Sequence, residues 1–239
     1  MTLNLLDIGI IFFLAIFLIT GMKTGVIREV VSLIGIIIVF ILSFAFKGIL
    51  GNFLCMVVPF IQFKGALEGI STMNILIFQT LAFLILFGIF LGIYTLLVKI
   101  SKFIQKIVNM TIILIIPSKI LGGIVSFIRG YIVIMIILMI LVVPFHSYAF
   151  FEDSLLANKI LYKTPILSPY TESFVAPIGE VYELTNQVAN KQIDANTANL
   201  KSLDIMLKYK IVSKAEVENL VRKRKLDDVK NIDSVLNKY

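Results

Sequence analysis

The chain has 239 residues, of which 59% are hydrophobic and only 15% are charged. Soluble domains are about 45–50% apolar and about 25% charged, so this composition excludes an ordinary soluble protein. The single Cys55 excludes an internal disulfide framework, and the single His146 leaves no material for a His-based metal site or a Ser–His triad.

Charge divides the chain into two parts. Residues 1–151 hold nine Lys or Arg and three Asp or Glu, whereas residues 152–239 hold 13 and 12. The net charge of +7 therefore belongs mostly to the apolar part, where the cations flank apolar runs. This pattern is typical of membrane anchors rather than of nucleic-acid binding. We expect a membrane domain over residues 1–151.

Four apolar stretches are long enough for transmembrane helices, which need about 20 apolar residues to cross about 30 Å of hydrocarbon. They lie at about residues 3–22, 30–46, 75–98 and 120–143. A shorter stretch, 48–63, contains Asn52, Pro59 and Gln62, and it predicts an interfacial or re-entrant segment. The expected fold class is an all-α integral membrane protein with about four transmembrane helices and a small helical C-terminal tail.

Basic residues between the spans predict the orientation, because short cytoplasmic loops are enriched in Lys and Arg. The segment between the second and third spans holds only Lys47 and Lys64. The other two segments hold Lys23, Arg28, Lys99, Lys102, Lys106 and Lys119. We therefore expect both termini outside the cytoplasm.

Small residues recur at four-residue spacing in the spans, as Gly21/Gly25, Gly88/Gly92 and Gly122/Ser126/Gly130. Small residues on one face let helix backbones approach closely in lipid. The three-member row predicts a helix contact face. The Gly88/Gly92 pair is explained equally well by the frequency of glycine in membrane helices.

Charged residues within the spans are few. Arg129 shares the face of Ser126, and three interpretations remain open: snorkelling to the headgroups, an ion pair with Glu29, or a role in transport or gating. Asp7 lies near the opposite surface, where an acid complements the dipole of a helix N-terminus.

The C-terminal part reads as a linker over residues 152–176, followed by a small polar helical tail over residues 177–239. Ser213 and Glu216 have the spacing of a capping box. The basic run Arg222–Lys225 fits either a solvated helix end or a phosphate-binding segment. Since Asp227 and Asp228 follow at once, we favour the solvated end and expect no nucleic-acid partner.

Several motifs resemble the colicin V production protein (CvpA) family. They are the opening Asn4-Leu-Leu-Asp7, the run from Gly21 to Glu29, the run from Ile120 to Gly130, and Thr164–Pro169. The resemblance covers about residues 3–170. It implies a bacterial cytoplasmic (inner) membrane protein linked to colicin V production or export and to envelope maintenance. The serine protease of some relatives is not expected, because residues 171–239 contain no histidine and no G-x-S-x-G.

The resemblance supplies no catalytic, cofactor-binding or metal-binding residues, so we expect a non-enzymatic scaffold or accessory protein. Such a protein would associate through its small-residue faces and support toxin or bacteriocin secretion and envelope homeostasis. The expected partners are the lipid bilayer, further copies of the chain, and secretion or envelope membrane proteins. The alternative is a small oligomeric transporter or channel.

Overall fold

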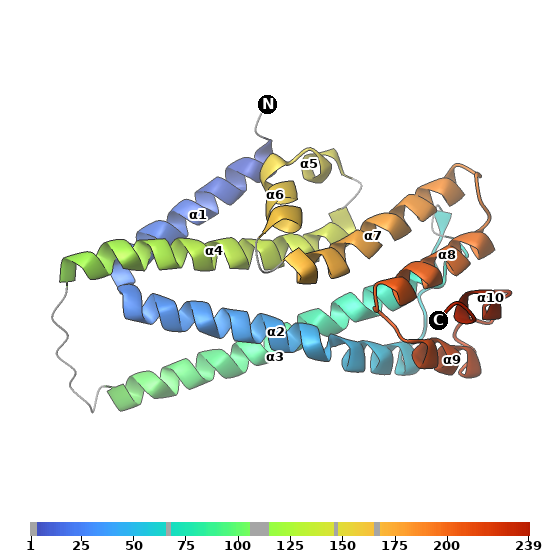
Figure 1. Cartoon of the computed structure of the whole chain (residues 1–239), viewed down its shortest axis with the longest axis horizontal. Helices are drawn as coiled ribbons and strands as arrows, with labels where there is room; N and C mark the ends of the chain where they lie inside the picture. Colours follow the sequence, from blue (N-terminus) through green and yellow to red (C-terminus); the bar gives the residue numbers. More distant parts are fainter. Residues whose placement is uncertain (1–3, 66–67, 106–114, 146–147, 165–167) are drawn as a thin grey trace. The chain divides into compact units, whose positions relative to one another are not determined.

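The computed structural model describes residues 4–65, 68–105, 115–145, 148–164 and 168–239. The regular secondary structure in these ranges is helical, with no β-strand (Figure 1). Four helices are long and apolar enough to cross a membrane. They are α1 (Leu5–Thr24), α2 (Val26–Val57), α3 (Met73–Gln105) and α4 (Ile115–Phe145). The all-α membrane architecture expected from the sequence is confirmed.

Six further helices follow α4 in the described ranges. They are α5 (Ala149–Glu152), α6 (Leu155–Lys163), α7 (Ser168–Ala189), α8 (Ala195–Lys208), α9 (Lys214–Arg222) and α10 (Asp233–Leu236). The expected linker 152–176 therefore contains α6 and the start of α7, and Pro177 lies inside α7 rather than before it. Ser213 and Glu216 form the predicted capping box at the start of α9.

Helix α2 is longer than the sequence indicates. Its 32 residues include Gly48–Val57, which we expected as part of a separate re-entrant segment. The polar Asn52 does not interrupt the helix, because its side chain bonds to the side chains of Gln79 and Glu216. At 1.5 Å per residue, α2 is about 48 Å long, and the hydrocarbon core is about 30 Å thick.

The chain forms two compact units. The first, which we call the bundle unit, consists of Met1–Ala45, Leu84–Leu138 and Ala149–Ile160. The second, the tail unit, consists of Phe46–Phe83, Met139–Tyr148 and Leu161–Tyr239. Helices α2, α3 and α4 each contribute residues to both. About 20 residues of α2, Val26–Ala45, belong to the bundle unit, which matches one membrane crossing.

Close backbone approach holds the helices of the bundle unit together. A Cβ on Gly122 of α4 would lie 2.6 Å from the carbonyl oxygen of Gly21 on α1. A Cβ on Gly35 of α2 would overlap the ring of Tyr94 on α3. The outer faces carry exposed large apolar side chains such as Ile38 and Ile89, as expected for lipid contact.

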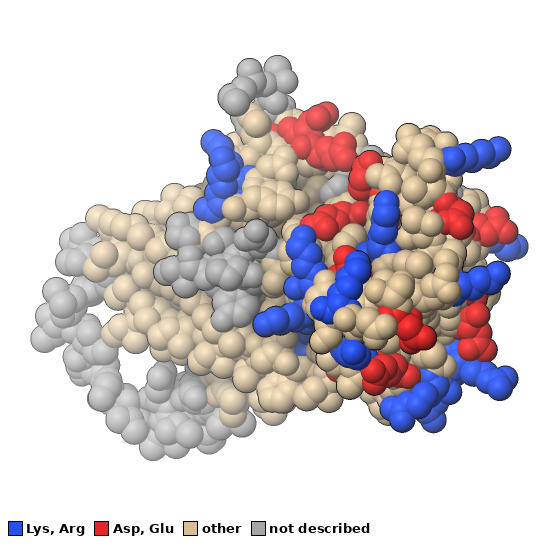
Figure 2. All heavy atoms as spheres, turned by 45° about the vertical axis from the view of Figure 1, so that its right-hand side comes forward, with Lys and Arg blue, Asp and Glu red and all other residues tan. Residues whose placement is uncertain are grey.

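The tail unit has its own hydrophobic core, to which the ends of α2 and α3 contribute. Cys55, Ile75 and Phe78 are buried with Leu203 and Met206 of α8 in one cluster. Residues of the tail, 177–239, thus share a core with the end of α2 and the start of α3. Charged side chains gather over one part of the surface, as Figure 2 shows.

Candidate functional site

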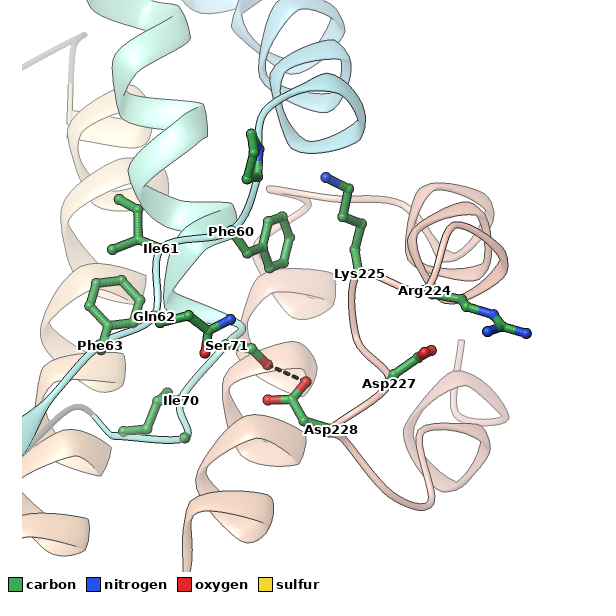
Figure 3. Close-up of a pocket in the computed structure, with 12 residues that line it drawn as sticks. Phe60, Ile61, Gln62, Phe63, Ile70, Ser71, Arg224, Lys225, Asp227 and Asp228 are labelled. Atoms are coloured by element: carbon green, nitrogen blue, oxygen red, sulfur yellow. Dashed lines mark hydrogen bonds between the residues drawn. The ribbon is translucent and has the colours of Figure 1, made fainter.

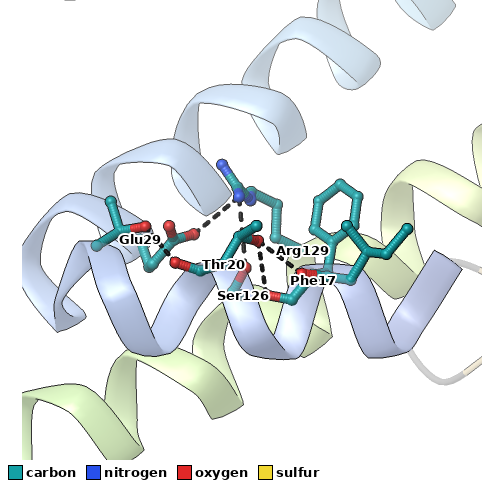
Figure 4. A network of polar contacts seen from close by, with 7 residues as sticks. Phe17, Thr20, Glu29, Ser126 and Arg129 are labelled. Carbon is teal, nitrogen blue, oxygen red and sulfur yellow. Dashed lines mark hydrogen bonds and ion pairs between the residues drawn. The ribbon is translucent and has the colours of Figure 1, made fainter.

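The polar centre of the bundle unit is an ion pair between α4 and α2. Arg129 Nη2 lies 3.0 Å from Glu29 Oε2, and the Glu29 side chain is only 2% exposed. Arg129 Nη2 also lies 3.4 Å from Ser126 Oγ, to which it donates a long hydrogen bond. The guanidinium carbon is 5.1 Å from the centre of the Phe17 ring, within the range of a cation–π interaction. Figure 4 shows these side chains converging between the helices.

Local backbone structure places Glu29 in this pair. Gly25, at φ 89°, separates α1 from α2, and a positive φ of this kind favours glycine. Glu29 lies in the first turn of α2, and its backbone N–H donates to the Gly25 carbonyl. The structure thus brings together Arg129 and Glu29, as in the ion-pair interpretation, one of the three that the sequence left open. The Arg129 side chain remains 24% exposed.

The small-residue row of α4 faces α1 of the same chain. Besides Gly122, a Cβ on Gly130 would lie 2.6 Å from Cγ of Phe17. Ser126 is fully buried, and a Cβ on Gly21 would overlap its Cβ. This face is therefore filled within the chain and leaves no room for a second copy. By contrast, among the described residues, no heavy atom outside the adjacent residues and backbone of α3 itself lies within 4 Å of a Cβ on Gly88 or Gly92.

Asp7 has a larger structural role than the sequence indicates. It is fully buried, and one of its oxygens accepts from Ser154 Oγ at 2.5 Å and from the Leu156 backbone N–H at 2.9 Å. The other oxygen accepts from the Asn4 backbone N–H at 3.2 Å, completing a capping box with the Asn4 side chain. One carboxylate therefore caps the N-termini of both α1 and α6. The sequence holds no local signal for this contact, because Ser154 follows 147 residues later.

In the tail unit, the basic run meets the end of α2. Lys225 Nζ donates to the Val58 carbonyl oxygen at 2.8 Å, just beyond the C-terminus of the helix. Asp228 accepts a hydrogen bond from Ser71 Oγ at 3.0 Å. Figure 3 shows both residues beside a pocket of about 410 Å³. Arg224 and Asp227 also line this pocket, so it holds two basic and two acidic side chains and favours no ion of one sign.

A metal site has no support in the described part of the chain, where no three of His, Cys, Asp or Glu are grouped to hold an ion. The candidate site is therefore the ion pair of Arg129 and Glu29 with the helix contacts around it. It can hold helices together, and it borders an open cleft.

Comparison with known proteins gives one match. No curated protein and no solved structure matches the chain. The sequence model of the colicin V production protein family matches residues 6–165, which are 160 of the 239 residues. The matched region contains Asp7, Glu29 and Arg129. It also contains the contact face between α1 and α4 and the open face of α3. The chain belongs to the colicin V production protein family.

Proposed function

We propose that the chain is a non-catalytic scaffold or accessory protein of the bacterial inner membrane. It supports production or secretion of a toxin of the colicin V type, together with envelope homeostasis. The observation that supports this proposal is that the buried carboxylates bond to groups on other helices. Asp7 caps two helices, and Glu29 pairs with Arg129 across two helices. In this proposal, these groups serve to hold the helices of the bundle together.

The tail unit supplies a surface for partners in this proposal. The count of basic residues between the spans favours a tail unit outside the cytoplasm. The open face of α3 at Gly88 and Gly92 supplies a second surface, within the bundle unit, for another copy or a membrane partner.

Crosslinking in living cells tests the proposal. A tag at Tyr239, which is 51% exposed, allows the full chain and its crosslinked partners to be purified and identified. We expect a secretion or envelope membrane protein at a stoichiometric ratio. Recovery of the chain alone, as a defined oligomer, contradicts the accessory role and favours the channel alternative.

A small oligomeric transporter or channel is the second candidate, because the partly exposed Arg129 borders an open cleft. Removing one partner of a buried ion pair costs about 3–5 kcal/mol, whereas replacing both is often nearly neutral. If the pair is structural, Arg129→Gln lowers the abundance of the protein in membranes, and the double variant Glu29→Gln/Arg129→Gln restores abundance and the cellular phenotype. If Arg129 carries transport, the double variant restores abundance but not the phenotype.

A further inference from the structure

A cleft of about 410 Å³ opens on the bundle unit beside the ion pair. All four long helices line it. The side chains that line it are of two kinds, charged and apolar. Arg28 and Lys99 supply charge, while Ile36 and Leu91 supply apolar surface.

The charges lining the cleft favour an anion. The cations are Arg28, Lys99 and Arg129, and Glu29 is the one carboxylate among the lining residues. Since Glu29 pairs with Arg129 at 3.0 Å, Arg28 and Lys99 give the cleft an excess of two positive charges. Tyr94 and Thr95 add hydroxyl groups to the same lining, and such groups bond readily to phosphate oxygens.

The order of these residues along the helices gives the cleft a charged end and an apolar end. Arg28 is the third residue of α2, and Ile36 lies eight residues further, about 12 Å along the axis. On α3, Lys99 closes the apolar span Met73–Lys99, and Leu91 lies eight residues before it. Both helices therefore place a cation at one level and an aliphatic side chain about 12 Å from it. Since each headgroup region of a bilayer is about 5–8 Å thick, a point about 12 Å from a bound phosphate lies among the acyl chains.

We propose that this cleft binds one anionic phospholipid, with its phosphate between Arg28 and Lys99 and an acyl chain along Ile36 and Leu91. Basic pockets between transmembrane helices are suited to anionic headgroups. The lipid would bridge α2 and α3 beside the ion pair. This binding site goes beyond the scaffold role and does not depend on it.

The absence of tryptophan from the chain allows a direct test. Phe17 lines the cleft, and Phe17→Trp places one fluorophore there in the full-length protein. Phe12→Trp is the matched control, because Phe12 lies on the same helix, is 67% exposed and does not line the cleft. Each variant is reconstituted in phosphatidylcholine vesicles containing a few mole per cent of lipid with brominated acyl chains. The brominated quencher is either phosphatidylglycerol or phosphatidylcholine.

In the Phe17→Trp protein, we expect brominated phosphatidylglycerol to quench the fluorescence at a mole fraction at least about fivefold lower than brominated phosphatidylcholine does. The reason is that each basic residue near a membrane surface contributes about 1 kcal/mol. The fluorescence of the Phe12→Trp control should respond equally to both lipids. In the Phe17→Trp background, Arg28→Gln or Lys99→Gln should reduce the preference about fivefold. Arg28→Lys should keep it, as should Lys23→Gln, which removes an exposed cation outside the cleft.

Three outcomes overturn the proposal. The first is equal quenching of the Phe17→Trp protein by the two lipids. The second is a preference that survives the combined Arg28→Gln/Lys99→Gln change. The third is loss of the preference when a few millimolar inorganic phosphate is added, because the cleft would then be a site for soluble phosphate. Circular dichroism and gel filtration of each variant confirm that the protein compared is folded.

Discussion

At the scale of single residues, the two buried carboxylates in the described part of the bundle unit, Glu29 and Asp7, are stabilised in different ways. Glu29 has a counter-charge, Arg129, at 3.0 Å. Asp7 has only neutral donors, two backbone N–H groups and one hydroxyl. Carboxylates that accept several such hydrogen bonds are stabilised in the charged form without a cation. The donors of Ser154 and Leu156 therefore stabilise the charged carboxylate of Asp7. In return, the carboxylate holds these two residues in place.

Replacing Asp7 by alanine should destabilise the protein by about 3 kcal/mol or more, because it leaves several buried donors without an acceptor at about 1–3 kcal/mol each. The measurement is the midpoint of thermal unfolding in detergent. Asp153→Ala is the control, since Asp153 is exposed and next to Ser154 in the chain. Equal midpoints for the two variants would show that Asp7 does not hold α6.

The sequence named Glu29 as the partner of Arg129 in one of three open interpretations, but it named no partner for Asp7. Glu29 is identifiable because both charges lie at the same level of neighbouring spans, and a charge within a span needs an opposite charge or water. Ser154 and the Leu156 N–H carry no comparable signal. Their contact with Asp7 depends on how the chain returns after α4, which local patterns do not encode.

At the scale of elements, close helix approach explains most of the small residues. The row of Gly122, Ser126 and Gly130 is filled by α1, as a contact face should be. The Gly88/Gly92 pair of α3 has no such neighbour. The sequence favoured the three-member row as a contact face and left the Gly88/Gly92 pair undecided, because two glycines at this spacing are common in membrane helices.

Gly122→Leu should lower the folded fraction of the protein sharply, because its side chain would enter the backbone of α1 at Gly21. Overpacking of this kind costs about 1–3 kcal/mol, and more where backbone must move. Gly88→Leu is the matched change, and we expect it to leave abundance in membranes unchanged. If Gly88→Leu alone alters crosslinking between copies, the open face is the contact of the oligomer. Equal abundance of the two variants would contradict the close contact of Gly122 with α1.

The full length of α2 was not predicted from the sequence. Four spans were predicted from apolar runs and are present. The extension through Val57 was not predicted, because Asn52, Pro59 and Gln62 together indicated that the apolar helix ends before them. Asn52 is helical because Gln79 and Glu216 satisfy its amide, and neither residue is near it in the sequence. Pro59 and Gln62 both lie beyond the helix, and a proline is expected outside a helix interior because it lacks the N–H donor.

At the scale of the whole molecule, the tail unit depends on contacts between distant segments. Asn199 of α8 is 1% exposed and accepts from the backbone N–H and the hydroxyl of Thr72, at 3.1 and 2.8 Å. Its amide donates to the Gly69 carbonyl at 2.7 Å. One side chain thus satisfies three groups in the connection between α2 and α3. The polar helical tail expected from the composition shares a hydrophobic core with the end of α2 and the start of α3.

Asn199→Leu should loosen this connection, since it leaves the Thr72 and Gly69 groups unpaired in a buried setting. Hydrogen exchange of residues 69–75 should rise by at least about tenfold, while exchange in the bundle unit stays unchanged. Asn190→Leu, at an exposed position after α7, is the control and should behave like the unaltered protein. Unchanged exchange at Thr72 in the Asn199→Leu variant would show that the tail does not stabilise the connection.

The pairing of Thr72 with Asn199 also has a consequence for biosynthesis. The two residues are 127 positions apart, and synthesis at about 5–20 residues per second separates their emergence by about 6 to 25 s. During that interval Ile75 and Phe78 lack the covering that α8 provides. The bond between Asn52 and Gln79 links α2 to α3 without any later residue. A nascent hairpin of α2 and α3 can therefore form before α8 is synthesised. A chaperone that acts on this protein would act during that interval.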